Sequence, residues 1–299
     1  MLVRFISHAA ISIEESGYNI LIDPWFLDST QEHPLIKSIG GGFDTIDFQI
    51  PQTTEKISQY TPDAIFVSHF HPHHSPMRDI NILCQNAIAN KKEIIIGYPT
   101  PNEQMENALS ERIPKGVIKK PMAHGVSITV GPFTIESKQH TVPFHNAWYI
   151  RSQKGSVLHL ADGAINKDIF NRKVDNAWMA LEKIKPDILF ISSGGHSARE
   201  TNKDGTRTIR EAGIFTAVEA AKVTRIIEPK AVALIGCYNH SIWKNRHEYI
   251  RQASQVLEEF DWAISYLNSD IKHLYIKPGN IFAINEPSYI KKCSAYFEN

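Results

Sequence analysis

Cysteine is scarce in this 299-residue chain, which has three cysteines at wide spacing, Cys84, Cys237 and Cys293. The number is odd and no Cys-x-x-Cys pair occurs, so the sequence gives no support for a disulfide framework. Few and scattered cysteines are typical of a reduced compartment. We therefore expect a cytoplasmic protein.

Net charge and long apolar runs are also lacking. The 32 lysines and arginines balance 32 aspartates and glutamates, so we expect neither nucleic acid nor a membrane surface as a partner. No apolar run approaches the length of a transmembrane segment, and residues 1–8 do not form a signal sequence. The hydrophobic content of 42% is ample for a sizeable core. These features predict a globular protein whose partner is a small molecule.

Histidine, in contrast, is concentrated in one short segment. Four of the six residues from position 69 to position 74 are histidines, namely His69, His71, His73 and His74. Imidazole is an unfavourable core group, but it is a good ligand for a borderline-soft cation. In an extended segment, His69, His71 and His73 would point to one side, where two imidazoles can meet one metal.

The flanks of this segment indicate where it lies in the fold. The apolar run 64–67 precedes the histidines and predicts a buried strand. Ser75 is expected to be the N-cap of a helix that begins at Pro76 and continues to about Asn90. The histidines are therefore expected where a buried strand becomes a helix.

The segment resembles the His-x-His-x-Asp-His signature of the metallo-β-lactamase fold superfamily. His73 departs from it, because the superfamily carries an aspartate there that usually ligates a second metal. The Asp23-Pro24 pair after the first strands resembles the opening of the branch with L-ascorbate-6-phosphate lactonase, N-acylphosphatidylethanolamine phospholipase D and CMP-N-acetylneuraminate hydroxylase-like proteins. That branch often has a histidine at the position of His8 without using it as a ligand, so we expect a core or supporting role for His8 and Asp23.

This resemblance, which covers most of residues 1–245, implies an α/β fold: a four-layer αββα sandwich. We expect one domain over residues 1–299, built from two αβ halves at about 1–150 and 151–299. Periodicity alone predicts only mixed α and β structure. The irregular insert at residues 26–52 is expected to be a lid over the pocket.

Local patterns predict the individual elements. Strands are expected at residues 2–6, 10–13, 18–22, 64–67, 93–97, 126–130, 133–137, 148–150, 156–160, 188–191 and 231–236. Helices are expected at residues 53–60, 76–90 and 167–185, and in a segment that ends near 227. Further short strands are expected after about residue 262.

The remaining ligands implied by the superfamily are expected at strand ends. His140 follows a predicted hairpin, and His145 is the alternative to it. Asp162, beside Gly163, resembles the ligand that bridges two metals in the superfamily.

The superfamily's last histidine is expected after the strand at 231–236, and His240 is the candidate. Cys237, His196 and His247 remain alternatives to it.

Together these observations predict a metal-dependent hydrolase that uses one or two zinc ions; iron or manganese would also suit the ligands. The expected ligands are His69, His71 and His140 for the first metal, and His73, His74 and His240 for a second, with Asp162 bridging or assisting. Asp162 and His73 are also the expected catalytic residues. Zinc held by such ligands lowers the pKa of bound water toward neutrality, and no Gly-x-Ser-x-Gly or other nucleophile motif competes with this chemistry.

A basic segment suggests the kind of substrate. Arg199, Lys203, Arg207 and Arg210 follow a strand end rich in small residues. We expect Arg199, Arg207 and Arg210 to hold a small anionic ester, lactone or phosphodiester, and a solvated basic loop is the alternative. Two other functions stay open, namely an iron-containing redox member of the superfamily and a non-catalytic metal or ligand sensor.

Overall fold

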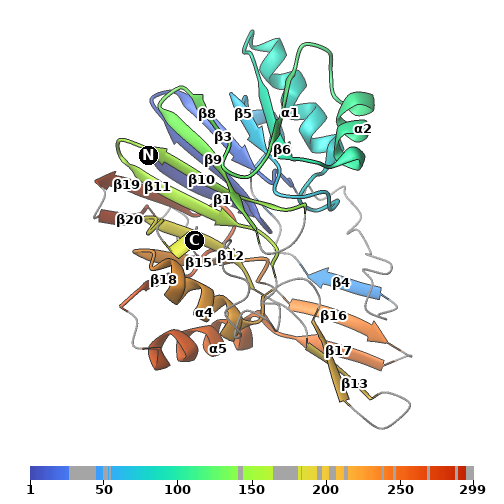
Figure 1. The fold of residues 1–299 in the computed structure, drawn as a ribbon, viewed down its shortest axis with the longest axis vertical. Coiled ribbons are helices and arrows are strands. Elements are labelled where there is room, and N and C mark those ends of the chain that lie inside the picture. The colour runs from blue at the N-terminus through green and yellow to red at the C-terminus, as the bar shows by residue number, and fades with distance from the viewer. Residues whose placement is uncertain are drawn as a thin grey trace, which may run out of the picture.

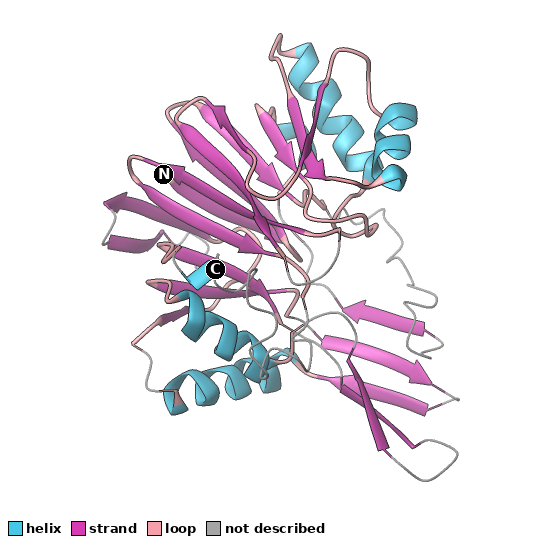
Figure 2. Ribbon diagram, viewed as in Figure 1, coloured by secondary structure: helices cyan, strands magenta, loops and turns pink. Residues whose placement is uncertain are grey.

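The computed structural model has two large β-sheets that lie face to face, with helices on the outer face of each sheet (Figures 1 and 2). The residues it describes are 1–26, 45–49, 53, 55–140, 144–163, 181–182, 184–193, 197–201, 207–211, 215–237, 239–244, 247–267, 270–286 and 289–293. In these ranges no helix has the length and apolar character needed to cross a membrane.

The first sheet has eight strands in the described residues. Their order is β20 (Tyr289–Cys293), β19 (Ile281–Glu286), β1 (Leu2–Ser7), β2 (Ala10–Glu15), β3 (Tyr18–Ile22), β5 (Ala64–Phe66), β6 (Ile95–Pro99) and β7 (Ile118–Met122). β1, β2 and β3 form an antiparallel meander, and β3, β5, β6 and β7 run parallel. Its outer face is covered by α1 (Met77–Ala89) and α2 (Glu103–Arg112), at the top of Figure 1.

The second sheet has seven strands in the described residues. Their order is β18 (Lys272–Leu274), β15 (Ala231–Ile235), β12 (Ile188–Ser192), β11 (Gly155–Leu160), β10 (Asn146–Ser152), β9 (Phe133–Gln139) and β8 (Ser127–Val130). Helices α4 (Ala217–Ile227) and α5 (Ala253–Tyr266) pack on its outer face.

Two smaller sheets lie beside this sandwich, at the lower right of Figure 1. One contains β17 (His247–Arg251), β16 (Asn239–Lys244) and β4 (Thr45–Gln49), and the other contains β13 (Ser197–Thr201) and β14 (Arg207–Glu211).

The layers follow from apolar side chains on both faces of the central strands. In β12, Ile188 and Phe190 face the space between the sheets, whereas Leu189 and Ile191 pack under α4 and α5. A strand buried on both faces has an apolar run instead of alternating polar residues. The predicted four-layer αββα sandwich is confirmed by this arrangement.

Gly97 of β6 allows an aromatic contact between the two sheets. A Cβ at this position would lie 2.5 Å from the ring of Phe66. That ring packs against Trp148 of β10, with 5.1 Å between the ring centroids. A side chain at position 97 would therefore push Phe66 out of the core between the sheets.

The strand directions bring several loops to one edge of the sandwich. In the first sheet, three strands run in the same direction, namely β1, β3 and β5. In the second sheet, four strands run in the same direction, namely β9, β11, β12 and β15. Two backbone hydrogen bonds join the sheets there: Asn146 N–H donates to Ser68 O at 2.9 Å, and Gly236 N–H donates to His8 O at 3.0 Å. Carboxyl ends of parallel strands are the usual place for a binding site in an α/β fold.

Most of the expected strands are confirmed. They correspond to β1, β2, β3, β5, β6, β8, β9, β10, β11, β12 and β15, and the expected helix at 76–90 corresponds to α1. The segment expected to be helical at 53–60 contains only a 3₁₀ turn, Ile57–Gln59. Most of the expected helix at 167–185 lies outside the described residues.

Three expectations about the chain organisation differ from the structure. The sequence analysis missed α2, α5 and β7, whereas the short strands expected after about residue 262 are confirmed as β18, β19 and β20, and the helix expected to end near residue 227 is confirmed as α4. The expected irregular lid contains β4, which pairs with β16, while residues 27–44 lie outside the described part. The chain passes from the first sheet to the second between β7 and β8, not near residue 150, and β19 and β20 return to the first sheet.

Candidate metal centre

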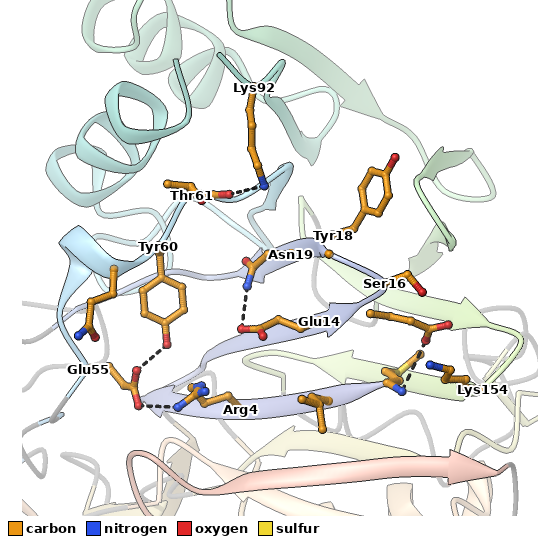
Figure 3. A pocket seen from close by; sticks show the side chains of 15 residues that line it. Arg4, Glu14, Ser16, Tyr18, Asn19, Glu55, Tyr60, Thr61, Lys92 and Lys154 are labelled. Carbon is orange, nitrogen blue, oxygen red and sulfur yellow. Dashed lines mark hydrogen bonds and ion pairs between the residues drawn. The ribbon is translucent and has the colours of Figure 1, made fainter. Parts of the chain in front are cut away.

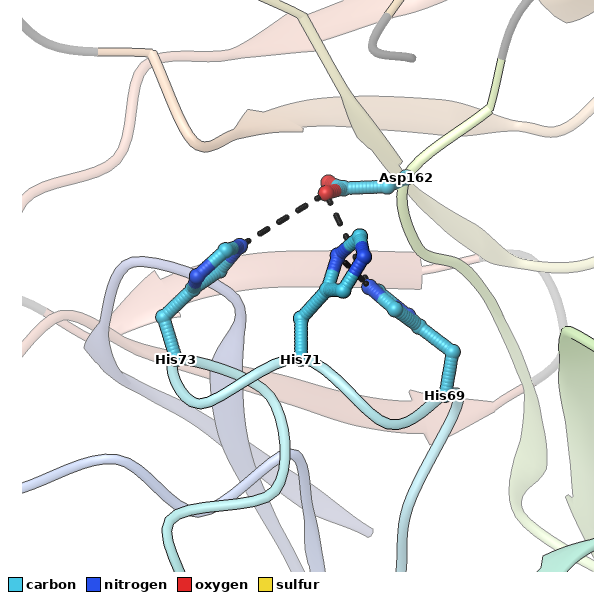
Figure 4. A group of neighbouring side chains, drawn as sticks. All are labelled: His69, His71, His73 and Asp162. Carbon is cyan, nitrogen blue, oxygen red and sulfur yellow. Dashed lines mark hydrogen bonds and ion pairs between the residues drawn. The ribbon is translucent and has the colours of Figure 1, made fainter. Parts of the chain in front are cut away.

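The histidine cluster lies on a turn between β5 and α1, not on an extended segment. The backbone N–H groups of His74 and Ser75 donate to His71 O at 2.9 and 2.7 Å, and the Ser75 hydroxyl donates to the same oxygen at 2.9 Å. Ser75 therefore closes the turn instead of capping α1, whose N-cap is Pro76 without a side-chain bond. The predicted extended geometry and N-cap are wrong, but the turn still brings the imidazoles of His69 and His71 together (Figure 4).

Asp23 holds this turn from the end of β3. Its buried carboxylate accepts hydrogen bonds from Ser68 N at 2.7 Å, from Ser68 Oγ at 2.6 Å and from His74 Nδ1 at 2.7 Å. Ser68 Oγ in turn lies 3.0 Å from Nδ1 of His69, which can donate to it. Because both Nδ1 atoms are engaged in this way, His69 and His74 present Nε2 to the site. The supporting role expected for Asp23 has this geometric basis.

Asp162 reaches the cluster from the second sheet, just after β11 (Figure 4). One of its oxygens, Oδ2, lies 3.8 Å from Nε2 of His69, 3.7 Å from Nε2 of His73 and 3.3 Å from Nε2 of His74. The Asp162 side chain is 7% exposed. A buried carboxylate oxygen that faces three imidazole nitrogens needs a cation or protons among them.

His145 lies against His69, and His140 lies beside His145. The His145 ring stacks on the His69 ring, with 4.1 Å between centroids and 19° between planes, and lies 5.5 Å from the His140 ring. His140 is buried, and a Cβ on Gly163 would lie 2.9 Å from its Cε1 atom. Gly163 therefore allows His140 to lie close to the chain beside Asp162.

The donor atoms form two overlapping groups in the described part of the chain. One group is His69, His71, His73 and Asp162, and the other is His8, His73 and His74. Within each group one donor atom per residue lies within 4.8 Å of the others. His73 belongs to both groups, so the two positions are adjacent.

Most of these imidazoles are neutral at pH 7. Burial lowers the pKa of His69 well below its usual value, and it lowers the pKa of His71 to about 4 and that of His140 to about 3. Burial also lowers the pKa of His73. Neutral imidazoles have the lone pairs that a metal needs.

The carboxylates set the remaining charges. Burial raises the pKa of Asp162, but His74 and the other imidazoles outweigh this effect and hold it well below its usual value. Burial lowers the pKa of His74, but Asp162 and Asp23 outweigh this effect and raise it to about 10. Neutral imidazoles around an ionised carboxylate are a donor set that fits zinc and equally fits iron.

A cavity of about 520 Å³ opens beside this centre. His69, His71 and His145 form one side of it, and Phe70 and Phe144 contribute apolar surface. The residues at the start of α2, 101–104, complete the wall. A small molecule in this cavity would lie directly against the metal-binding imidazoles.

A second cavity, of about 550 Å³, lies at the opposite end of β1 and β3 (Figure 3). Two of its cationic groups are paired with carboxylates: Arg4 Nη1 lies 3.0 Å from Glu55 Oε1, and Lys92 Nζ lies 3.1 Å from Asp63 Oδ2. The Tyr60 hydroxyl donates to Glu55 at 2.7 Å. Within each pair the positive and negative charges cancel. Among the described residues, this cavity has no group of metal donors like the one at the histidine turn.

The expected last ligand is less completely described. His240 lies on β16, where it pairs with Phe48 and Arg251, and His247 lies on β17; only the backbone of these strands is described. His196 lies outside the described residues. Cys237 Sγ lies 3.7 Å from Ala253 O, and this cysteine belongs to neither donor group.

The expected substrate-binding arginines lie on the β13–β14 hairpin. Arg199 pairs with Ile209, Arg210 with Ala198 and Arg207 with Thr201, and only the backbone is described there. Lys203 lies outside the described residues. The expected loop is therefore a β-hairpin for most of its length.

His8 lies at the site, where a core or supporting role was expected for it. It follows β1 with a φ of 42°, its ring is buried, and its Nε2 lies 3.4 Å from Nε2 of His74. In the sequence, His8 is visible only as a polar residue between two apolar strands. Its place beside the histidine turn follows from β1 and β5 ending at the same edge of the first sheet.

The chain matches no protein-family model and no curated protein sequence. Among solved structures it is similar to the metallo-β-lactamase fold protein YhfI from Bacillus subtilis, with a TM-score of 0.59 and 14% identity over 94% of this chain and 97% of that one. It is also similar to an isothiocyanate hydrolase from Delia radicum gut bacteria, with a TM-score of 0.56 and 10% identity over 95% and 99% of the two chains.

A third similar structure is CmlA, a diiron β-hydroxylase from Streptomyces venezuelae, with a TM-score of 0.59 and 14% identity. This match covers 92% of the present chain and 52% of CmlA. At such low identities the similarities establish the fold, which is the metallo-β-lactamase fold, and leave the activity to be inferred from the site.

Gly163→Ala should perturb the site through packing. The new Cβ would lie 2.5 Å from the Phe215 ring and 2.9 Å from the His140 ring. We expect a loss of about 1–3 kcal/mol of unfolding free energy from overpacking, together with weaker metal binding. Denaturant unfolding and metal titration measure the two effects. Gly116→Ala is the control for metal binding, because its Cβ meets open space and its φ of +95° strains the backbone without a contact to the site. Equal metal affinity in both variants would contradict the prediction.

Asp23→Asn should weaken metal binding, because the amide cannot accept all three hydrogen bonds that hold Ser68 and His74. We expect a metal affinity lower by about 10- to 100-fold, measured by competition with a chromogenic chelator. Asp187→Asn is the matched control, since that buried aspartate accepts from Ser156 N at 2.8 Å and from Lys230 Nζ at 2.6 Å at the start of β12. If both variants lose affinity equally, the effect of Asp23 is on general stability.

Proposed function

We propose that the protein is a metal-dependent hydrolase, with a metal held by His69, His71 and His140. The observation that supports this function best is the convergence of neutral imidazoles and one ionised carboxylate beside a cavity of about 520 Å³. Neither His140 nor His145 belongs to a donor group. His140 is proposed over His145 because it is buried beside Gly163, whereas His145 lines the cavity and can contact a substrate.

The bound metal would polarise the scissile bond and lower the pKa of a water molecule. The protein residues hold the ligand rings in place and supply the proton acceptor. Asp23 holds His74 directly and His69 through Ser68, so that Nε2 of each ring is directed at the site. Asp162 is the proposed acceptor for the water proton, since its carboxylate is ionised and buried in the cluster.

A second metal position follows from the second donor group. His73 and His74 are its proposed ligands, with Asp162 shared between the two ions. The superfamily resemblance would add His240 as the last ligand, but His240 belongs to neither donor group and only its backbone is described. His73 is also proposed as catalytic, since it belongs to both groups. Zinc is the proposed metal, because neutral imidazoles and a single carboxylate suit it.

The proposed substrate is a small anionic ester, lactone or phosphodiester. The described wall of the cavity has apolar surface from Phe70 and Phe144 but also the carboxylate of Glu103. Recognition of an anion would thus depend on Arg199, Arg207 or Arg210. The cytoplasm is the proposed location, on the basis of the scarce cysteines.

A redox function is the second candidate. Imidazole and carboxylate donors suit iron as well as zinc, and CmlA, a protein of similar fold, is described as a diiron β-hydroxylase. Elemental analysis together with visible absorption of the purified protein distinguishes the two candidates. If the purified protein contains iron and has a visible charge-transfer absorption band, the redox function is favoured over the hydrolase.

His71→Ala should remove metal and activity together. His71 Nδ1 lies 2.8 Å from His69 Nε2, so the two act as neighbouring ligands of one ion. We expect the first metal to be lost and hydrolysis to fall to background in a screen of phosphodiesters, lactones and esters. His273→Ala is the control, because His273 lies on β18 and belongs to neither donor group. Unchanged metal content in His71→Ala would disprove the proposed centre.

Neutralising the arginine that contacts the substrate should raise KM with little change in kcat, if the contact is equal in ground and transition states. Loss of one charge-assisted contact is worth about 1.5–3 kcal/mol, or roughly 10- to 100-fold in kcat/KM. Arg199→Ala, Arg207→Ala and Arg210→Ala should be compared with Lys115→Ala, an exposed charge before β7. Wild-type kinetics in all three would assign the hairpin to the solvated surface.

A further inference from the structure

His8, His73 and His74 form a compact group of imidazoles that the superfamily signature does not account for. The signature supplies an aspartate at position 73 and takes no ligand from the position of His8. Here both positions hold buried histidines, and their donor atoms lie within 4.8 Å of one another and of a His74 donor atom. The replacement at position 73 is thus accompanied by a further imidazole on the same side.

The spacing fits two ligands of one ion. Nε2 of His8 lies 3.4 Å from Nε2 of His74. Nitrogen ligands at zinc–nitrogen distances of about 2.0–2.1 Å in tetrahedral geometry are roughly 3.3–3.4 Å apart. The Asp162 oxygen lies 3.3 Å from the same His74 nitrogen, which is a similar separation.

Both rings are held in place by groups outside the site. His74 donates from Nδ1 to Asp23, which leaves Nε2 directed at His8. The backbone of His8 is fixed by the hydrogen bond from Gly236 to its carbonyl oxygen, and its ring meets Trp25 edge-on at 5.4 Å between centroids. Such support outside the ligands is typical of metal-binding histidines.

The His8 ring also has space for a small adjustment. A cavity of about 40 Å³ adjoins it, lined by Phe5, Leu234 and Cys237 among others. A Cβ on Gly236 would approach the His8 ring only to 3.7 Å. The ring therefore has room to adjust its position on the side of Gly236 and Cys237.

We propose that His8, His73 and His74 bind a second metal ion in a site of three imidazoles, with Asp162 shared with the first ion. This inference rests on the proposed metal-dependent function and makes His8, not His240, the third imidazole of the second position. A metal that binds there would displace the proton that the two carboxylates hold on His74. Three imidazole nitrogens favour zinc, cobalt, nickel, copper or iron over magnesium, calcium and manganese, which prefer oxygen ligands.

The first experiment is metal stoichiometry. The full chain is stripped with a chelator and titrated with Co²⁺ and with Zn²⁺, and bound metal is measured by elemental analysis. We expect two ions per wild-type chain and one in His8→Asn, in which asparagine keeps the left-handed backbone at φ 42°. His240→Ala should retain two ions.

A matched control tests whether removal of any buried imidazole has this effect. His159 is buried, and its Nε2 lies 2.9 Å from the carbonyl oxygen of Ala9, the neighbour of His8, but it belongs to neither donor group. His159→Gln should retain two ions. One ion in both His159→Gln and His8→Asn would assign the loss to packing and overturn the proposal.

The second experiment gives a positive signal that does not depend on activity. In the Co²⁺-loaded His8→Cys variant, a thiolate bound to the second ion should produce a cobalt–thiolate charge-transfer band that wild-type protein lacks. A folded His8→Cys variant with two ions and a wild-type spectrum would overturn the proposal. So would loss of the second ion in His240→Ala with two ions retained in His8→Asn.

Failure of this inference differs from failure of the proposed function. A wild-type chain that binds one ion and hydrolyses a substrate retains the function and disproves the second site. A wild-type chain that binds no divalent ion disproves both. If His8→Asn does not fold, as judged by circular dichroism, the cobalt spectrum of His8→Cys decides.

Discussion

The buried carboxylate of Asp23 determines the geometry of the whole centre. An anion in the interior costs several kcal/mol unless hydrogen-bond donors surround it. The donors here are the backbone and hydroxyl of Ser68 and Nδ1 of His74, all on the segment that carries the histidines. The need to satisfy one charge therefore fixes where the histidine turn begins and which nitrogens it offers to the site.

The charges at the site are balanced by neighbouring groups there, since the chain as a whole has no net charge. His74 lies between two carboxylates, Asp23 at 2.7 Å and Asp162 at 3.3 Å, whereas His69 and His71 are buried imidazoles of low pKa. A cation among these groups would meet ionised oxygen on one side and neutral nitrogen on the other. Asp162 thus supplies negative charge for a cation, while the charge of Asp23 is already balanced by its contact with His74.

The sandwich was predicted through the resemblance of the histidine segment to a superfamily signature, since periodicity alone predicts only mixed α and β structure. The metal-binding character of that segment was predicted from the sequence because it depends on a short-range pattern of histidines. The sequence analysis was wrong about the conformation of that segment and about Ser75, since the hydrogen bonds to His71 O compete with helix capping. It could not place His8 against His73 and His74, because the neighbours of His8 depend on strand order across the sheet. The α5 helix was missed because its apolar face alternates with exposed aromatics such as Trp262 and Tyr266.

The hydrogen bonds from Asn146 to Ser68 and from Gly236 to His8 have a consequence for stability. They join the two sheets at the edge where the ligands meet, and the ligands themselves come from both sheets. An ion bound there would act as a reversible crosslink between the two halves of the core. At a hundredfold excess over its dissociation constant, such a ligand adds about 2.7 kcal/mol to the free energy of unfolding. Chelation would then loosen the sandwich from this edge inward, so that metal supply would influence the lifetime of the folded protein as well as its chemistry.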